Sequence, residues 1–436
     1  MITSLWTLVV SLFNFINYHT PLFYLTQSVW RDEAFSYFMA KPGIIKIIVN
    51  TANDFNPPLY YLLLHYWTYI SGNSDVLLRI LSFIFHLLGT YYALLLGRKL
   101  SDKKQAFYLV IFYFFNPMLI YYAFEIRMYS LYAFAATAAI YYFYIKNWKR
   151  YIISSIIGLY SHSFFIFVII SLAFYDFIKS KFKKDVFKIL SPILFFIPWI
   201  PILAVQFVKS KESWFFKVDW QLVKSALGNL FTNYEGTPGH LWPYTALLSI
   251  GIFIFLFLCF KNKKLRGEIF IVPIIIPLFL ILSYSVIKRP IYVNRYLIFI
   301  TVFEIIAIFT GIVSIKNLAM RKTVTFLWIF FIMLFNFYIP PFKEKTDFKS
   351  TFIEINKIAN KEDQVFARTP IGYLESAYYY KTPENTFVYN PQNIHIPNYI
   401  GVNVIFPNVS ISNFPPAPSR LFMINDDASF EIIIQK

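Results

Sequence analysis

Long apolar runs alternate with short polar segments over the first 340 residues of the chain. Residues 75–97, 106–145 and 323–340 hold runs that reach across about 30 Å of hydrocarbon at a rise of 1.5 Å per residue. Residues 56–67 are apolar but too short to span, and two prolines open them. We expect a helix lying along the membrane surface there, with a short buried helix as the alternative. The pattern predicts an all-α polytopic membrane protein with about eleven transmembrane helices.

The last part of the chain has a different composition, because Lys, Glu, Asp, Asn and Pro rise sharply after residue 340. Short apolar runs alternate there with a helical pattern, which predicts a small α/β domain outside the membrane. We therefore divide the chain into a transmembrane domain, 1–340, and a soluble domain, 341–436. The apolar runs of the second domain are Phe352–Ile358, Gln364–Ala367, Leu374–Tyr380, Thr386–Tyr389, Arg420–Ile424 and Phe430–Ile434.

The formal net charge is +17, and the excess Lys and Arg lie mostly in short loops between apolar runs. Such loops remain in the cytoplasm under the positive-inside rule, so we read them as orientation signals and predict no nucleic-acid partner. Even numbers of crossings must then separate neighbouring basic loops, which places the soluble domain and several polar motifs outside the cytoplasm. We expect outer turns near residues 125–130, 161–163 and 288–295, and an outer polar loop at 209–240. The basic loops lie at 98–104, 146–150, 179–184, 261–266 and 316–322.

The outward-facing motifs form an ordered set. Arg31-Asp32-Glu33 follows the first long apolar run, and adjacent carboxylates belong at the membrane surface, since one at the bilayer centre costs about 2.5–3.5 kcal/mol. The later motifs are Asn56-Pro57-Pro58-Leu59-Tyr60-Tyr61, Glu125-Ile126-Arg127-Met128-Tyr129, Leu159-Tyr160-Ser161-His162, Arg289-Pro290 and Asn294-Arg295-Tyr296-Leu297.

Taken together, these motifs resemble the GT-C glycosyltransferases, in the branch of the protein O-mannosyltransferases and the lipid A aminoarabinose transferase. The resemblance implies a GT-C fold, a polyprenyl-phosphate-linked sugar donor and transfer with inversion of a hexosyl or pentosyl group. It implies that Asp32 is the general base. This chain departs from the family at Asn56, where members often have His, and at Phe124, where they often have Gln. A divalent metal ion is therefore left open, and no cofactor is predicted with certainty.

The chemistry expected of the residues agrees with this resemblance. A departing phosphate monoester has a second pKa near 6, so its charge must be held rather than protonated, and the planar Arg fork suits that task. We expect Arg127, Arg295, Arg289 and Arg31 to bind the donor phosphate, and Asp32 with Glu33 to act in catalysis. Candidate substrate-binding residues are Glu125, Tyr129, His162, Asn56, Tyr60 and His65, and weak candidates for a metal are Asp54, Glu125 and His162.

Several alternatives stay open at this point. Asp32 and Glu33 also suit the cap of a surface helix or a pair with Arg31, Glu125 suits a pair with Arg127, and the outer arginines suit lipid headgroups. A lipid-sugar transporter or flippase, or a glycan ligase or polymerase with a diphosphate-linked donor, is the rival function. The expected partners are membrane lipids and a protein, glycolipid or polysaccharide acceptor, in the plasma or inner membrane.

Overall fold

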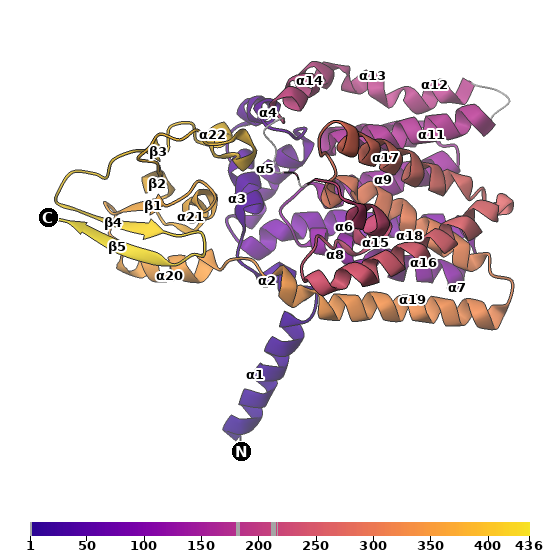
Figure 1. Ribbon diagram of the computed structural model, residues 1–436, viewed down its shortest axis with the longest axis horizontal. Coiled ribbons are helices and arrows are strands. Elements are labelled where there is room, and N and C mark those ends of the chain that lie inside the picture. The colour runs from indigo at the N-terminus through magenta and orange to yellow at the C-terminus, as the bar shows by residue number, and fades with distance from the viewer. Residues whose placement is uncertain (1, 180–183, 211–214, 216) are drawn as a thin grey trace. The chain divides into compact units, whose positions relative to one another are not determined.

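The computed structural model describes residues 2–179, 184–210, 215 and 217–436 (Figure 1). Parts of the predicted loops at 179–184 and 209–240 lie outside these described residues. The chain forms two compact units by its internal contacts. Unit 1 comprises residues 1–24, 79–201 and 215–342, and unit 2 comprises residues 25–78, 202–214 and 343–436. The domain division at residue 340 stays a prediction.

Unit 1 is built from helices. Apolar side chains surround most of them, as expected for helices in lipid. Their bounds are α1 Ile2–Tyr18, α6 Asp75–Leu100 (its first turn in unit 2), α7 Lys103–Phe114, α8 Pro117–Ala123, α9 Tyr129–Tyr144, α10 Trp148–Ser161, α11 Ile166–Lys179, α12 Lys184–Leu190, α13 Pro192–Phe196, α15 Trp220–Thr232, α16 Trp242–Lys261, α17 Glu268–Ile287, α18 Ile298–Val313 and α19 Leu318–Tyr338.

The chain is a multi-pass membrane protein, and the predicted all-α polytopic class is confirmed. Among the described residues, six helical segments are long and apolar enough to span a bilayer, or seven if the bent pair α7 and α8 counts as one. Helices α9, α10 and α11 are not among them, because they have only 14 to 16 residues and a span usually needs about 20. The turns predicted near residues 125–130, 161–163 and 288–295 separate helices as expected.

Helix α18 is the core of unit 1. Every residue from Ile298 to Ile312 is buried, and the helix packs against α16, α17, α7 and α9. Close approach is required at Gly311, where an added Cβ would lie 2.6 Å from the Phe255 carbonyl oxygen of α16. Helix α15 was expected to be polar loop. It packs on α16 instead, because Gly228 allows the two backbones to meet at Thr245.

Unit 2 combines short helices with one sheet. Helix α20 is amphipathic, and Asp347 caps its first turn by accepting the Ser350 amide. The helices are α3 Arg31–Ala40, α4 Ile44–Asn53, α5 Leu59–Ser71, α20 Phe348–Ile358, α21 Tyr373–Tyr379 and α22 Val402–Ile405, with α2 Leu22–Thr26 and α14 Ile200–Lys209 at the unit boundaries. The strands are β1 Gln364–Ala367, β2 Thr386–Tyr389, β3 Ser410–Ile411, β4 Ser419–Ile424 and β5 Phe430–Gln435.

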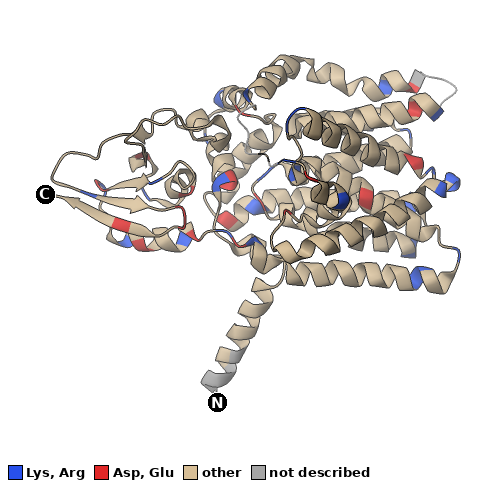
Figure 2. Ribbon diagram, in the orientation of Figure 1, with Lys and Arg blue, Asp and Glu red and all other residues tan. Residues whose placement is uncertain are grey.

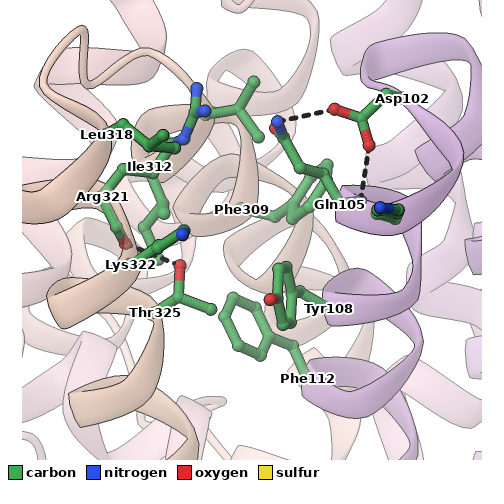
Figure 3. Close-up of a pocket in the computed structure, with 12 residues that line it drawn as sticks. Asp102, Gln105, Tyr108, Phe112, Phe309, Ile312, Leu318, Arg321, Lys322 and Thr325 are labelled. Carbon is green, nitrogen blue, oxygen red and sulfur yellow. Dashed lines mark hydrogen bonds between the residues drawn. The ribbon is translucent and has the colours of Figure 1, made fainter.

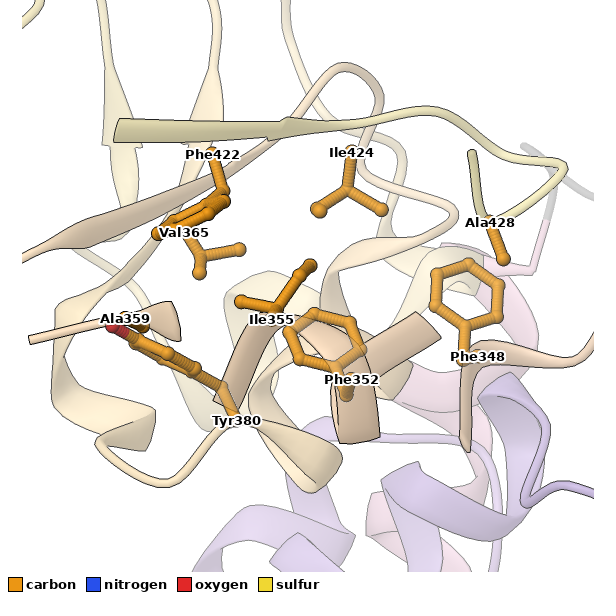
Figure 4. Close-up of a cluster of buried hydrophobic side chains, with 9 residues drawn as sticks. All are labelled: Phe348, Phe352, Ile355, Ala359, Val365, Tyr380, Phe422, Ile424 and Ala428. Atoms are coloured by element: carbon orange, nitrogen blue, oxygen red, sulfur yellow. The ribbon is translucent and has the colours of Figure 1, made fainter. Parts of the chain in front are cut away.

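The sheet has the strand order β3-β2-β1-β4-β5, parallel except for the antiparallel pair β4 and β5. Alternate residues of β1 point to opposite faces. Val365 joins Phe352, Ile355 and Phe422 beneath α20, as Figure 4 shows, whereas Phe366 joins Leu421 and Met423 on the other face. The predicted small α/β fold of this segment is confirmed.

Candidate functional site

The acidic motif forms the first turn of α3, and Trp30 is the N-cap residue. Negative side chains are favoured there by the helix dipole. The Arg31 Nε lies 3.6 Å from the Asp32 Oδ1, so the pair considered from the sequence is present, but the two side chains keep 21% and 15% of their surface exposed. A carboxylate at a helix start with part of its surface open can still meet a ligand.

Glu33 is in a different environment, because its side chain is fully buried. The Lys345 ammonium lies 3.1 Å from its Oε2, and the Trp30 amide donates to the same oxygen at 3.4 Å. The backbone amide of Lys345 donates to the Gln27 side chain at 2.7 Å. The sequence did not single out Lys345. Its contacts hold the start of the segment 343–436 next to α3, the helix that carries the acidic motif.

A second residue that the sequence did not single out is Glu375 of α21. This carboxylate lies beside the same helix start and is only 6% exposed. Burial raises the pKa of Glu375 to about 8. The backbone N–H and the charge of Arg31 act to lower that pKa, whereas the charge of Asp32 acts to raise it. Glu375 is thus held next to Arg31 and Asp32, and its pKa makes it largely protonated at neutral pH.

Further contacts fix α3 against the segment 343–436. The Val29 amide donates to the Tyr379 hydroxyl at 2.6 Å, and the rings of Tyr37 and Tyr378 pack edge to face at 5.1 Å. Asp75 accepts hydrogen bonds from the Tyr378 and Tyr379 hydroxyls and pairs with Lys349, each at 3.0 Å. The start of α3 therefore packs against the C-terminal segment, residues 343–436.

The predicted residues around α5 also lie in unit 2. The Asn56 amide donates to Asp54 at 3.4 Å. The Nδ1 of His65 lies 2.7 Å from the carbonyl oxygen of Ala40, the last residue of α3, and Tyr60 is fully buried. His65 thus joins α5 to α3, and Tyr60 lies in the buried core of unit 2.

In unit 1, the Glu125-Ile126-Arg127 motif forms the turn between α8 and α9, as predicted. Glu125 and Arg127 are 1% and 6% exposed. The Arg127 amide donates to the Glu125 carbonyl at 2.8 Å, and the Ser82 hydroxyl donates to the Arg127 carbonyl at 3.2 Å. The Arg127 guanidinium lies 5.8 Å from the centre of the Tyr129 ring. A tight, anchored turn therefore presents a buried cation.

His162 joins this turn to Arg295, although the three segments are far apart in sequence. Its ring lies 5.0 Å from the ring of Tyr132, nearly parallel to it, and 5.0 Å from that of Tyr296. Burial lowers the pKa of His162 to about 3, and the charges of Arg127 and Arg295 lower it as well. The imidazole is therefore neutral, and the positive charge of the cluster comes from the two guanidinium groups.

The remaining predicted phosphate ligand of unit 1 is Arg289. It is half-buried in the same segment as Arg295 and precedes it by six residues. The sequence also missed Glu304, which is fully buried inside α18. A carboxylate within an apolar run was a signal for it. Among the described residues, no three His, Cys, Asp or Glu side chains are grouped to hold a metal ion. Of the weak metal candidates, Asp54 belongs to unit 2, and Glu125 and His162 belong to unit 1.

Comparison with known proteins identifies the fold. No protein-family model matches the sequence, and no curated protein matches it. Solved structures of ArnT from Cupriavidus metallidurans match it over 97% of this chain, with a TM-score of 0.61 and 9% identity. The chain has the fold of ArnT. The apo structure of ArnT is covered over 94% of its length, and the structure bound to undecaprenyl phosphate over 93%.

Proposed function

We propose that this protein is an integral-membrane glycosyltransferase that moves a sugar from a polyprenyl-phosphate donor to an extracytoplasmic acceptor. The observation that carries the proposal is the ArnT-like fold along 97% of the chain, since one of the matching ArnT structures holds undecaprenyl phosphate. The order of the outward motifs on that fold supports it independently. The protein would act in the plasma or inner membrane, with its site on the outer side.

Arg127 and Arg295 are the proposed donor-phosphate ligands. Both lie close enough to His162 to lower its pKa, and that histidine adds no charge of its own. A guanidinium group is permanently charged and offers parallel donors to two phosphate oxygens. The leaving polyprenyl phosphate gains charge as the glycosidic bond breaks, so two fixed cations would stabilise the transition state more than the bound donor. Arg289 and Arg31 remain further candidates.

Asp32 is the proposed general base. The acceptor must lose a proton as it attacks the anomeric carbon, and Asp32 keeps part of its surface exposed at the start of α3. Attack on the face opposite the phosphate inverts the configuration, and the transition state resembles an oxocarbenium ion. Glu33, held by Lys345, would position the turn that carries Asp32.

The test is sugar transfer from a labelled polyprenyl-phosphate donor in proteoliposomes supplied with cell-envelope acceptors. Asp32→Asn is expected to lower the rate at least about 100-fold, the usual worth of a general base, with unchanged expression. Glu354→Gln, which removes an exposed carboxylate from α20, is the matched control and should transfer at the normal rate. A fully active Asp32→Asn variant would remove Asp32 from the mechanism.

The chemical form of the sugar donor distinguishes the proposed transferase from a glycan ligase or polymerase. A ligase or polymerase would use a diphosphate-linked sugar, so the two donors should be offered in competition. We expect transfer from the monophosphate donor alone. A flippase would move the lipid-linked sugar across the vesicle without releasing polyprenyl phosphate, and that outcome would contradict the proposal.

A further inference from the structure

A cavity of about 240 Å³ lies between the starts of α7 and α19 and the end of α18 in unit 1. Three of its lining side chains are cationic: Lys104, Arg321 and Lys322. Figure 3 labels Arg321 and Lys322. The three residues belong to two basic loops that are more than two hundred positions apart in the sequence. Figure 2 shows Lys and Arg gathered at this end of the unit 1 helices. The fold therefore brings these charges together in one cavity. The positive-inside rule requires them on the cytoplasmic side of the membrane but not next to one another.

The charges are not balanced by the protein. Within the described residues, no carboxylate lies within ion-pair distance of Lys104, Arg321 or Lys322. Asp102 also lines the cavity, but it caps α7 by accepting hydrogen bonds from the Gln105 amide at 2.9 Å and from its side chain at 2.7 Å. The cavity thus carries a net positive charge.

The position of these cations is unfavourable in the protein alone. Lys104 lies in the first turn of α7, and Arg321 and Lys322 follow directly on the first turn of α19. The positive end of a helix dipole repels cations there and attracts anions. The Asp102 cap offsets this effect at α7, whereas α19 has a neutral cap, Asn317, and no acidic residue in its first turn. An anion in the cavity would relieve both the repulsion among the side chains and that with the start of α19.

The rest of the lining is apolar. Phe112 and Phe309 form its buried wall, and Tyr108 and Leu318 are exposed at its edge, 38% and 54%. Since α7, α18 and α19 include segments long and apolar enough to span a bilayer, we expect this edge to face lipid. A soluble anion would satisfy only the cations, whereas a phospholipid offers a phosphate to the cations and an acyl chain to the apolar edge.

We propose that this cavity binds the headgroup of one anionic phospholipid. The site is separate from the proposed transfer site, because α18 begins beside Arg295 and ends at the cavity. Its 16 residues span about 24 Å. The lipid would come from the opposite leaflet and would hold α7, α18 and α19 together. The inference does not depend on the transfer reaction.

The experiment is native mass spectrometry of the full chain, released from nanodiscs that contain phosphatidylglycerol or phosphatidylcholine. We expect one phosphatidylglycerol to stay bound to the wild type. The triple variant Lys104→Gln, Arg321→Gln, Lys322→Gln should weaken its binding about 100-fold, at about five-fold or 1 kcal/mol for each cation. The control triple Lys99→Gln, Lys149→Gln, Lys264→Gln removes the same charge from exposed positions elsewhere and should bind as the wild type does.

A second variant keeps the test valid if the triple variant does not fold. Leu318→Trp adds bulk at the exposed edge of the cavity without changing charge, and it should also release the lipid. The thermal midpoint of the wild type should rise with phosphatidylglycerol and not with inorganic phosphate. Equal retention by all variants, equal binding of phosphatidylcholine, or an equal rise with inorganic phosphate would each overturn the proposal.

Discussion

The ion pair between Glu33 and Lys345 provides a quantitative test of how α3 is held. Both side chains are nearly inaccessible, at 0% and 6%, and the charged atoms are 3.1 Å apart. Lys345→Met keeps most of the length of the side chain and removes its charge. Losing one partner of a buried pair costs about 3–5 kcal/mol, because the remaining charge loses its compensation. In a unit of about 160 residues, 1 kcal/mol shifts the midpoint of thermal unfolding by about 2–4 °C.

We therefore expect Lys345→Met to lower the unfolding midpoint of the detergent-solubilised protein by about 10 °C. Sugar transfer should fall with it, since Asp32 precedes Glu33 in the same turn. Lys349→Met is the matched comparison. Its side chain is 45% exposed, and its partner Asp75 keeps two tyrosine hydroxyl donors, so the shift should be much smaller.

A double-mutant cycle isolates the interaction itself. Glu33→Gln removes the charge that Lys345→Met leaves behind, so the double variant should be less destabilised than the sum of the single variants. We expect a coupling free energy of at least about 1 kcal/mol. The buried pair does not stabilise the fold if the two single effects add within about 0.5 kcal/mol, or if Lys345→Met and Lys349→Met shift the midpoint equally.

Three further predictions concern other contacts. Arg127→Lys should lower transfer at least about 100-fold while leaving the unfolding midpoint nearly unchanged, because Lys keeps the charge but loses the planar fork; near-normal kinetics would contradict this. The pKa of Glu375 is raised from 4.5 to about 8, so the folded protein holds its proton more tightly than the unfolded chain does. The stability that this group contributes is complete below pH 4.5 and falls as the pH rises to about 8. Glu375→Gln should therefore make the unfolding midpoint less dependent on pH between those values, and an unchanged pH profile would count against this. Gly401→Ala should destabilise unit 2 by about 1–3 kcal/mol, measured by thermal unfolding, because φ is +85° and the new Cβ would lie 2.6 Å from the Phe35 ring; a neutral substitution would show that α22 does not press on α3.

Much of the fold was predictable, because apolar length and loop charge are strong local signals. The turn at Glu125 to Tyr129 and the break at His162 were predicted where the structure has them. The runs Gln364–Ala367 and Thr386–Tyr389 are strands with the bounds expected of them. Helix α15 was missed because its buried face mixes polar residues with apolar ones, and Gly228 lets that face lie close against α16.

The candidate site was only partly predictable, for a different physical reason. Arg127, His162 and Arg295 could be grouped from the sequence because each belongs to a turn that the loop charges predict to face outward. The partners of α3 could not, since Lys345 and Glu375 lie more than three hundred residues away in a segment that offers many similar charges. Burial, rather than residue type, distinguishes them, and burial of a charged side chain is set by the tertiary fold.

The most direct measurement is the release of polyprenyl monophosphate when the purified, reconstituted protein meets a polyprenyl-phosphate-linked sugar and an acceptor extract. We expect this release to require the protein and to equal the sugar transferred, mole for mole. Sugar transfer without release of the monophosphate, or movement of intact lipid-linked sugar across the bilayer in its place, would contradict it.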